Sequence, residues 1–316
     1  MTDVQRGSEY VRENGELGGA HVSYRETIYV NVLGNNVERF QGGGRSFIYK
    51  PLAFAQTKDR EIWAQDTIAP LLSSIRVPCI HAASETFKQG IDWLIYEDLG
   101  PLQHCTTSLG IIEAAGWIKE WHRLPVSLVP SEFAGHTPHV ADIVQQVLPE
   151  ADYLPERIDN PQMDAIAEWI KLVIARGPAI FNELPVVSHG DYHPYNVAVR
   201  QDERIVLDWE FVHLNHRYWD LYSLLDITSY RYEKPMLLRD ERAAALNVYW
   251  DNQQEVSSSK EHFTQGYYLY ASLYSAWIAG LIENDRKREE LPQDKLLRQR
   301  RETSAVFNDC LRELII

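Results

Sequence analysis

Several common features are missing from this sequence, and each absence narrows its class. No apolar run approaches the length needed to cross a membrane, and the first residues are polar and charged. We therefore expect no transmembrane helix and no signal peptide, and a cytoplasmic location is the default expectation. The three cysteines, Cys79, Cys105 and Cys310, are odd in number and widely spaced. This pattern fits neither a disulfide framework nor a zinc site, so we expect plain thiols.

Positive charge is also scarce. The 316 residues include 31 lysines and arginines against 45 aspartates and glutamates, which gives a formal net charge of −14. Binding to nucleic acid requires a basic surface, so a nucleic-acid partner is not expected. The acidic balance is compatible with a cationic small-molecule partner, although many cytoplasmic proteins are acidic without one.

The common glycine-rich phosphate-binding motifs, G-x-G-x-x-G and G-x-x-x-x-G-K-[ST], are both absent. Two shorter segments, Gly34-Asn35-Asn36 and Gly18-Gly19, compete as the loop that covers the phosphates. Backbone amides at Gly34 could face phosphate oxygens. A simple turn is the alternative there, and Gly42-Gly43-Gly44 is predicted to be the turn of the next hairpin.

The most informative segment that is present reads His189-Gly190-Asp191-Tyr192-His193-Pro194-Tyr195-Asn196. It follows a short apolar run, residues 186–188, so Asp191 is predicted to lie in the loop after a strand. Phosphoryl transfer requires an acceptor hydroxyl, a phosphate chain and cations held in line. An Asp followed five positions later by an Asn can supply a base and a metal ligand for this chemistry. Taken singly, either residue could instead be an ordinary turn residue.

A predicted hairpin follows this loop and returns a second acid to it. Two apolar runs, residues 197–199 and 205–207, flank the polar turn at residues 200–204, which is a hairpin signal. The hairpin would bring Asp208 back beside Asn196. An amide oxygen and a carboxylate form an oxygen-only ligand set suited to Mg²⁺.

These residues resemble the aminoglycoside phosphotransferase and choline kinase superfamily, whose loop has the form H-G-D-x-x-x-x-N and whose metal-binding Asp often opens a D-W-E triplet. Gly190, where protein kinases carry Arg, and Trp209-Glu210, where they carry Phe-Gly, indicate the small-molecule branch. The resemblance implies that Asp191 is the catalytic base and that Asn196 and Asp208 bind Mg²⁺. It gives His189 a structural role, whereas His193 is as readily packed or solvated as in contact with phosphate.

The resemblance also implies a fold. We expect an α+β, two-lobed, protein-kinase-like architecture with a small antiparallel-sheet N-terminal lobe and a larger, mainly helical C-terminal lobe. The composition along the chain divides into an N-terminal extension at residues 1–24, a nucleotide-binding lobe and hinge at 25–99, and a helical lobe with the catalytic loop and acceptor site at 100–316.

The N-terminal part offers two further kinase features. Residues 46–50 form an apolar strand that ends in Lys50, which is predicted to neutralise nucleotide phosphates. An amphipathic helix is predicted to follow, and Glu61 in it is the predicted partner of Lys50. The interval between them is short for the family, Asp59 is a substitute candidate, and a first-turn acid favoured by the helix dipole is the alternative for Glu61.

The segment Trp93–Gly100 is predicted to be the strand that crosses into the hinge between the lobes. The resemblance implies that the nucleotide base is held there by main-chain groups, namely the carbonyl of Glu97 and the amide of Leu99. Recognition through the main chain does not distinguish ATP from GTP.

Further along, the resemblance implies that Asp220 braces the catalytic loop by hydrogen bonding. Three helices are expected after residue 240, with polar breaks at 252–260 and 284–294. The alternating Tyr and Leu pattern at 267–277 favours a packed helix face over a cation-binding aromatic cage. Acidic residues that could meet an acceptor amine, or simply face solvent, are Asp226, Glu283 and Asp285.

Three functions are compatible with these features. The first is an ATP-dependent kinase, with GTP as the alternative donor, that phosphorylates a hydroxyl of a small molecule such as an aminoglycoside, an amino alcohol or a sugar. The second is a protein kinase, which the missing glycine motif and Gly190 disfavour. The third is a non-catalytic nucleotide-binding scaffold, which the complete set of catalytic residues disfavours. The oligomeric state is not decided by the sequence.

Overall fold

The computed structural model describes residues 9–19, 21–31, 33–85, 91–135, 138–160, 162–251 and 259–315. The chain forms two compact units. Unit 1 consists of Met1–Gln103 and Asn196–Val212, and unit 2 of His104–Tyr195 and His213–Ile316. The expected extension and the expected break at 252–260 lie partly outside the described residues. The division of the sequence into three segments stays a prediction.

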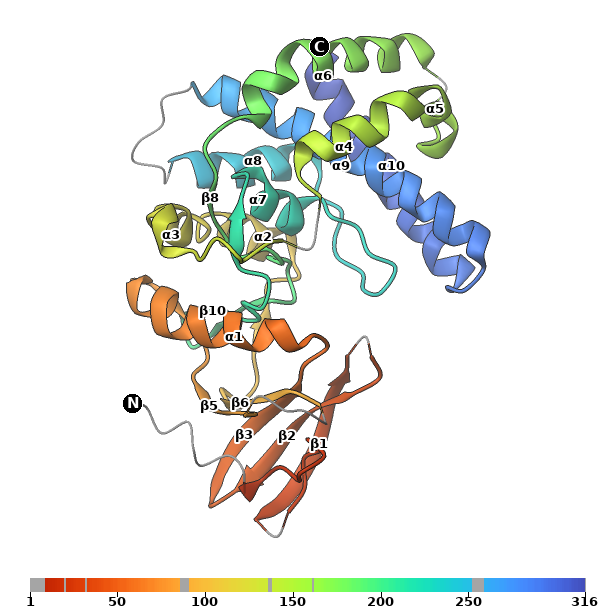
Figure 1. The fold of residues 1–316 in the computed structure, drawn as a ribbon. Helices are drawn as coiled ribbons and strands as arrows, with labels where there is room; N and C mark the ends of the chain where they lie inside the picture. The colour runs from red at the N-terminus through yellow and green to blue at the C-terminus, as the bar shows by residue number, and fades with distance from the viewer. Residues whose placement is uncertain are drawn as a thin grey trace. The chain divides into compact units, whose positions relative to one another are not determined.

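Unit 1 is built on a five-stranded antiparallel sheet with the strand order β1-β2-β3-β6-β5 (Figure 1). The hairpin turn between β2 and β3 contains Gly43 and Gly44 with φ of 58° and 74°, in the left-handed region where glycine is favoured. This is the turn that the sequence predicted. The strands are β1 (Val22–Val30), β2 (Asn36–Gly42), β3 (Arg45–Pro51), β5 (Ile80–Ala83) and β6 (Trp93–Glu97).

One helix covers part of this sheet. Helix α1 (Ala55–Trp63) packs Ile62 against a cluster formed by Leu52, Ile80 and Leu94. It continues into a π-helical turn, η2 (Ala64–Ile68), and a short 3-10 turn, η3 (Ala69–Leu71). The helix therefore follows β3 directly and rests on β5 and β6.

Residues from the predicted N-terminal extension contribute to the core of unit 1. Val11 and Leu17 form an isolated bridge and are buried with Phe40, Phe47 and Trp93. The apolar side chains of this segment were too few to show a helical or strand period in the sequence, so its packing was not predicted.

A second small sheet in unit 1 contains the hairpin that the sequence predicted. Strands β9 (Val197–Arg200) and β10 (Glu203–Val206) pair antiparallel, and β10 pairs in parallel with β4 (Ile75–Arg76). Gln201 and Asp202 connect β9 to β10 with φ of 48° and 69°, which is typical of a tight two-residue hairpin turn. Strand β7 (Gln103–His104) lies where the chain passes from unit 1 to unit 2.

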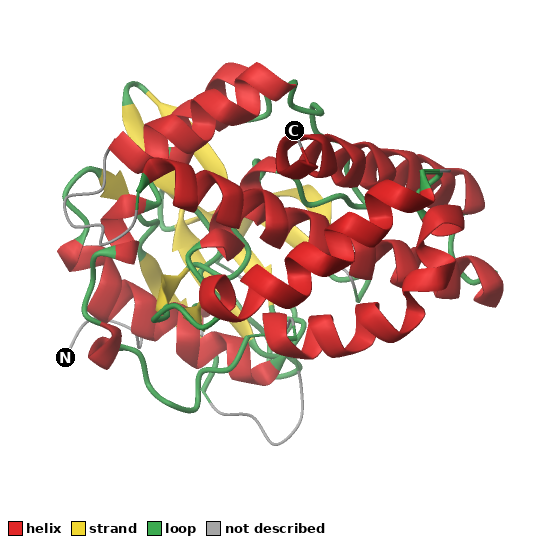
Figure 2. Ribbon diagram, turned by 90° about the horizontal axis from the view of Figure 1, so that it is seen from above, coloured by secondary structure: helices red, strands yellow, loops and turns green. Residues whose placement is uncertain are grey.

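Unit 2 is mainly helical and contains the short antiparallel pair β8 and β11. Figure 2 draws the helices of the whole chain in red. The three helices predicted after residue 240 are confirmed as α8, α9 and α10, but the predicted break at 284–294 is shorter, because α9 continues to Arg288 and α10 begins at Gln293. The long α9 packs along α10. The elements are α2 (Ser108–Ala115), α3 (Lys119–His122), η4 (Val126–Leu128), α4 (Val140–Val147), η5 (Leu148–Tyr153), α5 (Leu154–Arg157), α6 (Met163–Phe181), β8 (Val186–Ser188), β11 (His213–Asn215), α7 (Tyr218–Leu225), α8 (Arg239–Asp251), α9 (Lys260–Arg288) and α10 (Gln293–Ile315).

The core of unit 2 is rich in aromatic rings. Tyr270 and Tyr274 of α9 are fully buried and stack with ring centroids 4.5 Å apart. Offset and edge-to-face ring pairs of this kind add about 0.5–1.5 kcal/mol each beyond the apolar area that they bury. The prediction that the Tyr and Leu pattern of residues 267–277 is mostly a packed helix face is therefore confirmed.

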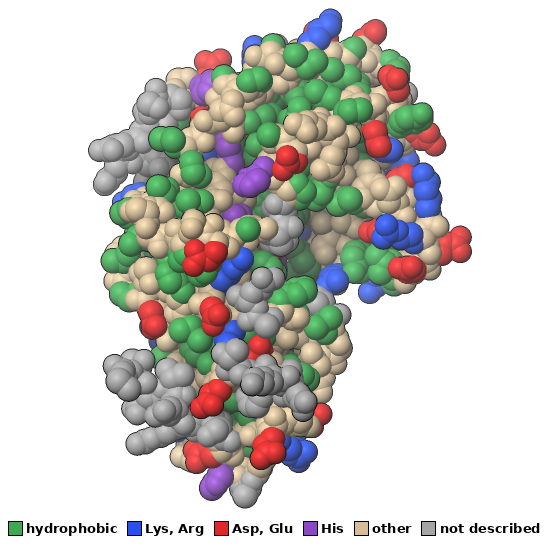
Figure 3. Space-filling view, in the orientation of Figure 1, with side chains coloured by type: hydrophobic (Ala, Val, Ile, Leu, Met, Phe, Trp, Pro, Cys, Tyr) green, Lys and Arg blue, Asp and Glu red, His purple; other side chains and the backbone are tan. Residues whose placement is uncertain are grey.

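The charge of the surface and the polarity of the helices are as expected from the sequence composition. Figure 3 shows acidic side chains in red interspersed with basic ones in blue over the face that it draws. Among the described helices, not one is both long enough and apolar enough to cross a membrane.

Candidate functional site

A cluster of one lysine and three acids forms the centre of the site in unit 1. Lys50 lies near the end of β3, opposite Leu94 of β6, and its side chain is only 13% exposed. Its Nζ atom lies 2.9 Å from Glu61 Oε1, 2.5 Å from Asp208 Oδ1 and 3.2 Å from Glu210 Oε2. The structure therefore brings the predicted Lys50 and Glu61 together.

Glu61 reaches the cluster from the last turns of α1. Its side chain is buried, and while one oxygen holds Lys50, the other accepts a hydrogen bond from the backbone N–H of Trp209 at 3.2 Å. The short sequence interval from Lys50 to Glu61 is thus long enough, because α1 begins soon after β3 ends. Asp59, the other candidate, is exposed on the same helix.

Asp208 follows β10 and has a φ of 64°, in the left-handed region. Non-glycine residues rarely adopt this conformation, although Asp and Asn tolerate it best. The next residue, Trp209, is fully buried and donates its indole N–H to the Val206 carbonyl at 3.3 Å. The buried indole anchors the turn that presents the Asp208 carboxylate.

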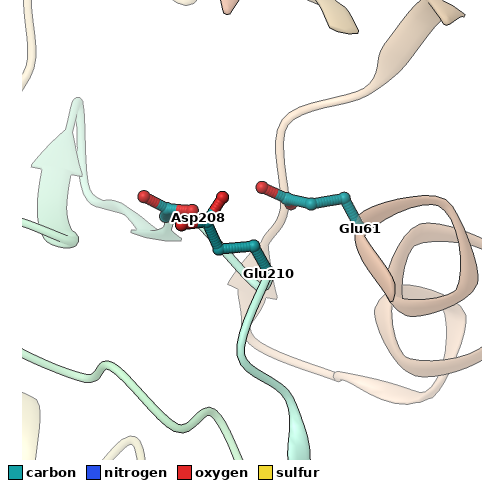
Figure 4. Close-up of side chains that lie close together, drawn as sticks. All are labelled: Glu61, Asp208 and Glu210. Carbon is teal, nitrogen blue, oxygen red and sulfur yellow. The ribbon is translucent and has the colours of Figure 1, made fainter. Parts of the chain in front are cut away.

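Figure 4 shows the carboxylates of Glu61, Asp208 and Glu210 pointing toward one another, and one oxygen of each lies within 4.8 Å of the others. Three carboxylates around one ammonium leave two negative charges uncompensated if all are ionised. Burial, followed by the charge of Asp208, raises the pKa of Glu210 to about 8. The cluster therefore favours additional positive charge, and its oxygen-only donor set fits a hard divalent cation such as Mg²⁺.

Asn196, the other predicted metal ligand, stands at the start of the same hairpin. It is buried, and its backbone carbonyl accepts the N–H of Leu207 at 2.8 Å. Val197 pairs with Val206 in the hairpin, and the bond between Leu207 and Asn196 adds one more step to this ladder. Asn196 therefore lies beside Leu207, the residue that precedes Asp208. The hairpin thus brings the backbone of Asn196 close to that of Asp208, as the sequence predicted.

The hinge candidates have side chains that are occupied within unit 1. Glu97 accepts from Arg76 Nη2 at 2.7 Å and from the Cys79 N–H at 2.9 Å. Asp98 accepts from Ser46 Oγ at 2.6 Å and from Arg39 Nε at 2.8 Å. Leu99 packs its side chain in the small apolar cluster around the hairpin. Main-chain groups are therefore the ones that these residues can offer to a base.

Gly34 lies in the tight loop between β1 and β2 with a φ of 81°. The Asn31 side chain organises this loop, because its Oδ1 accepts the N–H groups of Leu33 and Asn35, both at 3.0 Å. Its Nδ2 donates to the Pro51 carbonyl at 3.1 Å, one residue after Lys50. The Gly34 loop is thereby attached to the end of the strand that carries Lys50. Its predicted contact with phosphate stays a prediction.

The predicted catalytic loop belongs to unit 2, and Asp220 of α7 organises it. The fully buried Asp220 carboxylate accepts from Ser188 Oγ at 2.8 Å and from the backbone N–H groups of His189 at 3.0 Å and Gly190 at 3.2 Å. The bracing role implied for Asp220 is supported by these bonds. Gly190 has a φ of 86°, which a side chain would disfavour.

Two more groups hold the same carboxylate from α3. Trp121 Nε1 donates to Asp220 at 2.8 Å, and His122 Nε2 lies 3.1 Å from it. Burial alone would raise the pKa of Asp220, but the hydrogen bonds from His122 and Trp121 hold that pKa well below its usual range. Burial lowers the pKa of His122, so we assign a neutral ring that donates from Nε2 and accepts the Tyr249 hydroxyl at Nδ1.

Asp191 lies in this loop, five positions before Asn196 in the sequence. Its backbone N–H donates to His189 Nδ1 at 3.3 Å, so His189 helps to hold the loop. Its side chain is 31% exposed and lies 3.6 Å from His193 Nε2. The loop therefore presents a partly exposed carboxylate on a backbone that the buried Asp220 carboxylate fixes.

Two residues differ from the sequence expectation. Asp226 does not face solvent or an acceptor amine, because it is buried in a bidentate ion pair with Arg242 and accepts from the Tyr267 hydroxyl. Glu210 was named only as part of a motif, and its place in the carboxylate cluster was missed. The D-W-E triplet was the signal, because the buried Trp209 sends the residues on both sides of it toward Lys50.

Comparison with known proteins gave one family match. A sequence model of a family described as the phosphotransferase enzyme family matches residues 39–256, well over half of the chain. A search of curated proteins found no match.

Solved structures with the same fold are numerous. An aminoglycoside 2′-phosphotransferase mutant in complex with GDP is 12% identical, with a TM-score of 0.61 and 92% of each chain covered. An aminoglycoside phosphotransferase from Alicyclobacillus acidocaldarius is 12% identical, with a TM-score of 0.57, 93% of this chain and 92% of that chain covered. A spectinomycin phosphotransferase in complex with ADP and spectinomycin is 13% identical, with a TM-score of 0.55, 91% of this chain and 89% of that chain covered. These matches show a shared fold, the α+β kinase-like architecture that the sequence predicted.

Proposed function

The chain belongs to the phosphotransferase enzyme family, which makes it a small-molecule kinase, and we propose that it moves the γ-phosphoryl group of ATP to a hydroxyl of a small acceptor. The observation that carries this proposal is the Lys50 ammonium held between Glu61 and Asp208 at 2.9 and 2.5 Å. A strand lysine paired with a helix glutamate, with a further aspartate close by for the metal, is the arrangement that kinases use to hold a nucleotide phosphate chain.

In this proposal the metal-binding residues are Asp208 and Asn196. When bound there, Mg²⁺ supplies positive charge that offsets the charge developing on the phosphate oxygens. The excess of carboxylates over ammonium groups in the cluster supports the assignment. Glu210 adds a third oxygen donor that can reach the same ion or its water ligands.

Lys50 has the task of neutralising nucleotide phosphate. Burial would lower the pKa of Lys50, but the charges of Asp208 and Glu61 raise that pKa well above its usual value. The side chain is therefore a permanent cation at any physiological pH. Glu61 fixes the direction of the Lys50 side chain. The rest of the nucleotide is proposed to be held by main-chain groups of Glu97 and Leu99 and by the Gly34 loop.

Asp191 is proposed to orient the acceptor hydroxyl and to accept its proton late in the transfer. Its partial exposure leaves the carboxylate accessible to a small molecule, while its backbone is held by the Asp220 network. Because the chain carries an excess of acidic residues, an acceptor with amino groups is favoured within the proposal. Structures of the similar proteins contain ADP in one case and GDP in another, so the choice of ATP over GTP stays a prediction. The cytoplasmic location is likewise a prediction.

The test is Mg²⁺-dependent nucleotide consumption by the wild type and by Asp191→Ala, with ATP and GTP, over a panel of aminoglycosides, amino alcohols, sugars and nucleosides. We expect acceptor-stimulated turnover in the wild type and a loss of roughly 10²-fold or more in the variant, because a general base typically contributes that much. Nucleotide affinity should be nearly unchanged. Nucleotide binding without turnover on any acceptor would favour the scaffold instead, and full turnover in Asp191→Ala would refute the assignment of the base.

A further inference from the structure

His193 lies two positions after Asp191 in the same loop, and its protonation pattern follows from its contacts. The Nδ1 atom accepts a hydrogen bond from the backbone N–H of Tyr195 at 3.2 Å. A neutral imidazole accepts at one nitrogen and donates at the other, so Nε2 carries the hydrogen. That Nε2 lies 3.6 Å from Oδ2 of Asp191. His193 therefore places a nitrogen that carries a hydrogen 3.6 Å from the carboxylate.

A tyrosine from another element holds the imidazole ring in this orientation. The ring of Tyr232 lies against that of His193, with centroids 4.9 Å apart and planes 34° apart. Tyr195 packs its ring on Tyr232 at 5.3 Å and donates its hydroxyl to the Glu233 carbonyl at 2.8 Å. As a result the His193 side chain is only 13% exposed, although it belongs to a loop.

The segment that carries Tyr232 is itself fixed by α10. Arg298 Nη2 donates to the carbonyls of Ser229 at 3.2 Å and Tyr230 at 3.3 Å, and Nη1 lies 3.1 Å from Glu233 Oε1. Just before it, Gln299 Nε2 donates to the Thr228 carbonyl at 3.0 Å. The ring of Tyr232 thus rests on backbone that a helix holds at several points.

We propose that His193 is a positioning residue: its Nε2–H holds the Asp191 carboxylate in the rotamer that faces the acceptor hydroxyl, and Tyr232 braces the imidazole for this task. The inference rests on the proposed function, in which Asp191 is the base. The terminal torsion of a carboxylate is broad, so burial of its backbone does not orient it. A contact of 3.6 Å is longer than a hydrogen bond, but contacts in catalytic sites are often long without substrate and shorten when it binds.

Two pairs of variants separate the N–H group from the ring. His193→Gln keeps an N–H donor near the position of Nε2 and loses the ring, whereas His193→Phe keeps a ring against Tyr232 and loses the donor. Tyr232→Phe keeps the brace, whereas Tyr232→Leu removes its flat face. Each variant is assayed for kcat and KM of the best acceptor, for nucleotide Kd, and for thermal unfolding.

We expect His193→Phe to lower kcat by about 10-fold to 100-fold with KM and nucleotide Kd nearly unchanged, because misplacing a catalytic group by about 1 Å costs up to 10²-fold. His193→Gln keeps the donor but has no ring for Tyr232 to brace, so it should lose about 10-fold or less and stay faster than His193→Phe. Tyr232→Leu should lower kcat by about 10-fold, and Tyr232→Phe should leave it within about 2-fold.

Several results would overturn the inference. One is a His193→Phe enzyme with wild-type kcat. Another is a His193→Gln enzyme as slow as His193→Phe, which would show that a retained N–H donor does not preserve activity. A rise in KM alone would make His193 an acceptor contact instead. If His193→Phe does not fold, the comparison of the two Tyr232 variants decides, and equal kcat in both refutes the brace. If the wild type shows no turnover with any acceptor, the proposed function itself fails, and this result is known before any variant is compared.

Discussion

The carboxylate of Glu61 accepts the backbone N–H of Trp209 at 3.2 Å. With its other oxygen the same carboxylate holds Lys50 at 2.9 Å. One buried side chain on α1 therefore fixes both the lysine that is proposed to meet phosphate and the turn that presents Asp208. A change at Glu61 disturbs two groups of the proposed nucleotide site at once.

Replacing Glu61 separates these two contacts. Glu61→Gln can still accept the Trp209 N–H through its amide oxygen but lacks the charge that holds Lys50, whereas Glu61→Ala lacks both. We expect Glu61→Ala to lose about 1–3 kcal/mol of unfolding free energy, since it leaves a buried N–H unsatisfied, and Glu61→Gln to lose less. Urea unfolding measures the difference. The control is Asp59→Asn, which changes an exposed acid of the same helix. Equal stability of the Gln and Ala variants would contradict the role given to the Trp209 bond.

Replacing Asp208 with Asn tests the metal site. Asn tolerates the left-handed backbone but carries no charge. We expect the Mg²⁺-dependent part of nucleotide affinity to fall by about 10-fold to 100-fold, because a charge-assisted contact is worth about 1.5–3 kcal/mol. Calorimetric titration with and without Mg²⁺ measures it. Asp202→Asn is the matched control, since Asp202 is an exposed aspartate with a φ of 69° in the β9–β10 turn. Unchanged Mg²⁺ dependence in Asp208→Asn would remove Asp208 from the ligand set.

Asp220 is expected to make stability depend on pH. Its folded-state pKa is depressed, so its contribution to stability is fully present above the unfolded-state value of about 3.9 and is lost as pH falls toward the folded-state pKa. Asp220→Asn should destabilise the protein at pH 7 by about 2 kcal/mol or more, since it breaks charged, buried hydrogen bonds.

The difference in stability between the wild type and Asp220→Asn should therefore become smaller below about pH 4. Thermal unfolding from about pH 7 to about pH 3 measures it, with Asp152→Asn, an exposed aspartate of η5, as the control. A gap that stays constant across this range would show that Asp220 acts through packing and not through its charge.

The buried pair of Arg242 and Asp226 is predicted to support unit 2 without touching nucleotide. Arg242→Met leaves the carboxylate without its ion partner, which should cost about 3–5 kcal/mol of unfolding free energy. The double variant Arg242→Met/Asp226→Leu should recover much of that loss, because no uncompensated charge stays buried. Chemical unfolding of the single and double variants measures the coupling, and nucleotide affinity of the folded single variant should equal that of the wild type. A double variant less stable than the single one would contradict this account.

The sequence predicted those parts of the site that depend on neighbours along the chain. Asn196 and Asp208 were predicted to lie together because a hairpin with a short turn forces the pairing, and this register is present. Lys50 and Glu61 were predicted from the kinase pattern of a strand lysine paired with a helix glutamate, and the short interval that counted against the pair suffices because α1 begins soon after β3 ends. Residues 267–277 were predicted as core from their apolar and aromatic spacing.

What the sequence did not predict depends on burial. Glu210 was predicted only as the last residue of the D-W-E triplet, and its approach to Lys50 depends on the burial of Trp209 beside it. Asp226 could not be separated from a solvent-facing aspartate, because its partner Arg242 lies on the following helix and a buried ion pair leaves no local pattern. The packing of Val11 and Leu17 in unit 1 is likewise a contact between segments far apart in the chain.

The left-handed backbone at position 208 limits which residues evolution can place there. A branched or bulky side chain would strain the turn, and the longer side chain of Glu does not form the local hydrogen bond by which Asp and Asn offset the strain. Only Gly, Asn and Asp fit readily, and of these Asp alone brings a charge. Any natural homologue that loses the carboxylate at this point can therefore be expected to carry Asn or Gly, which keep the turn without the charge.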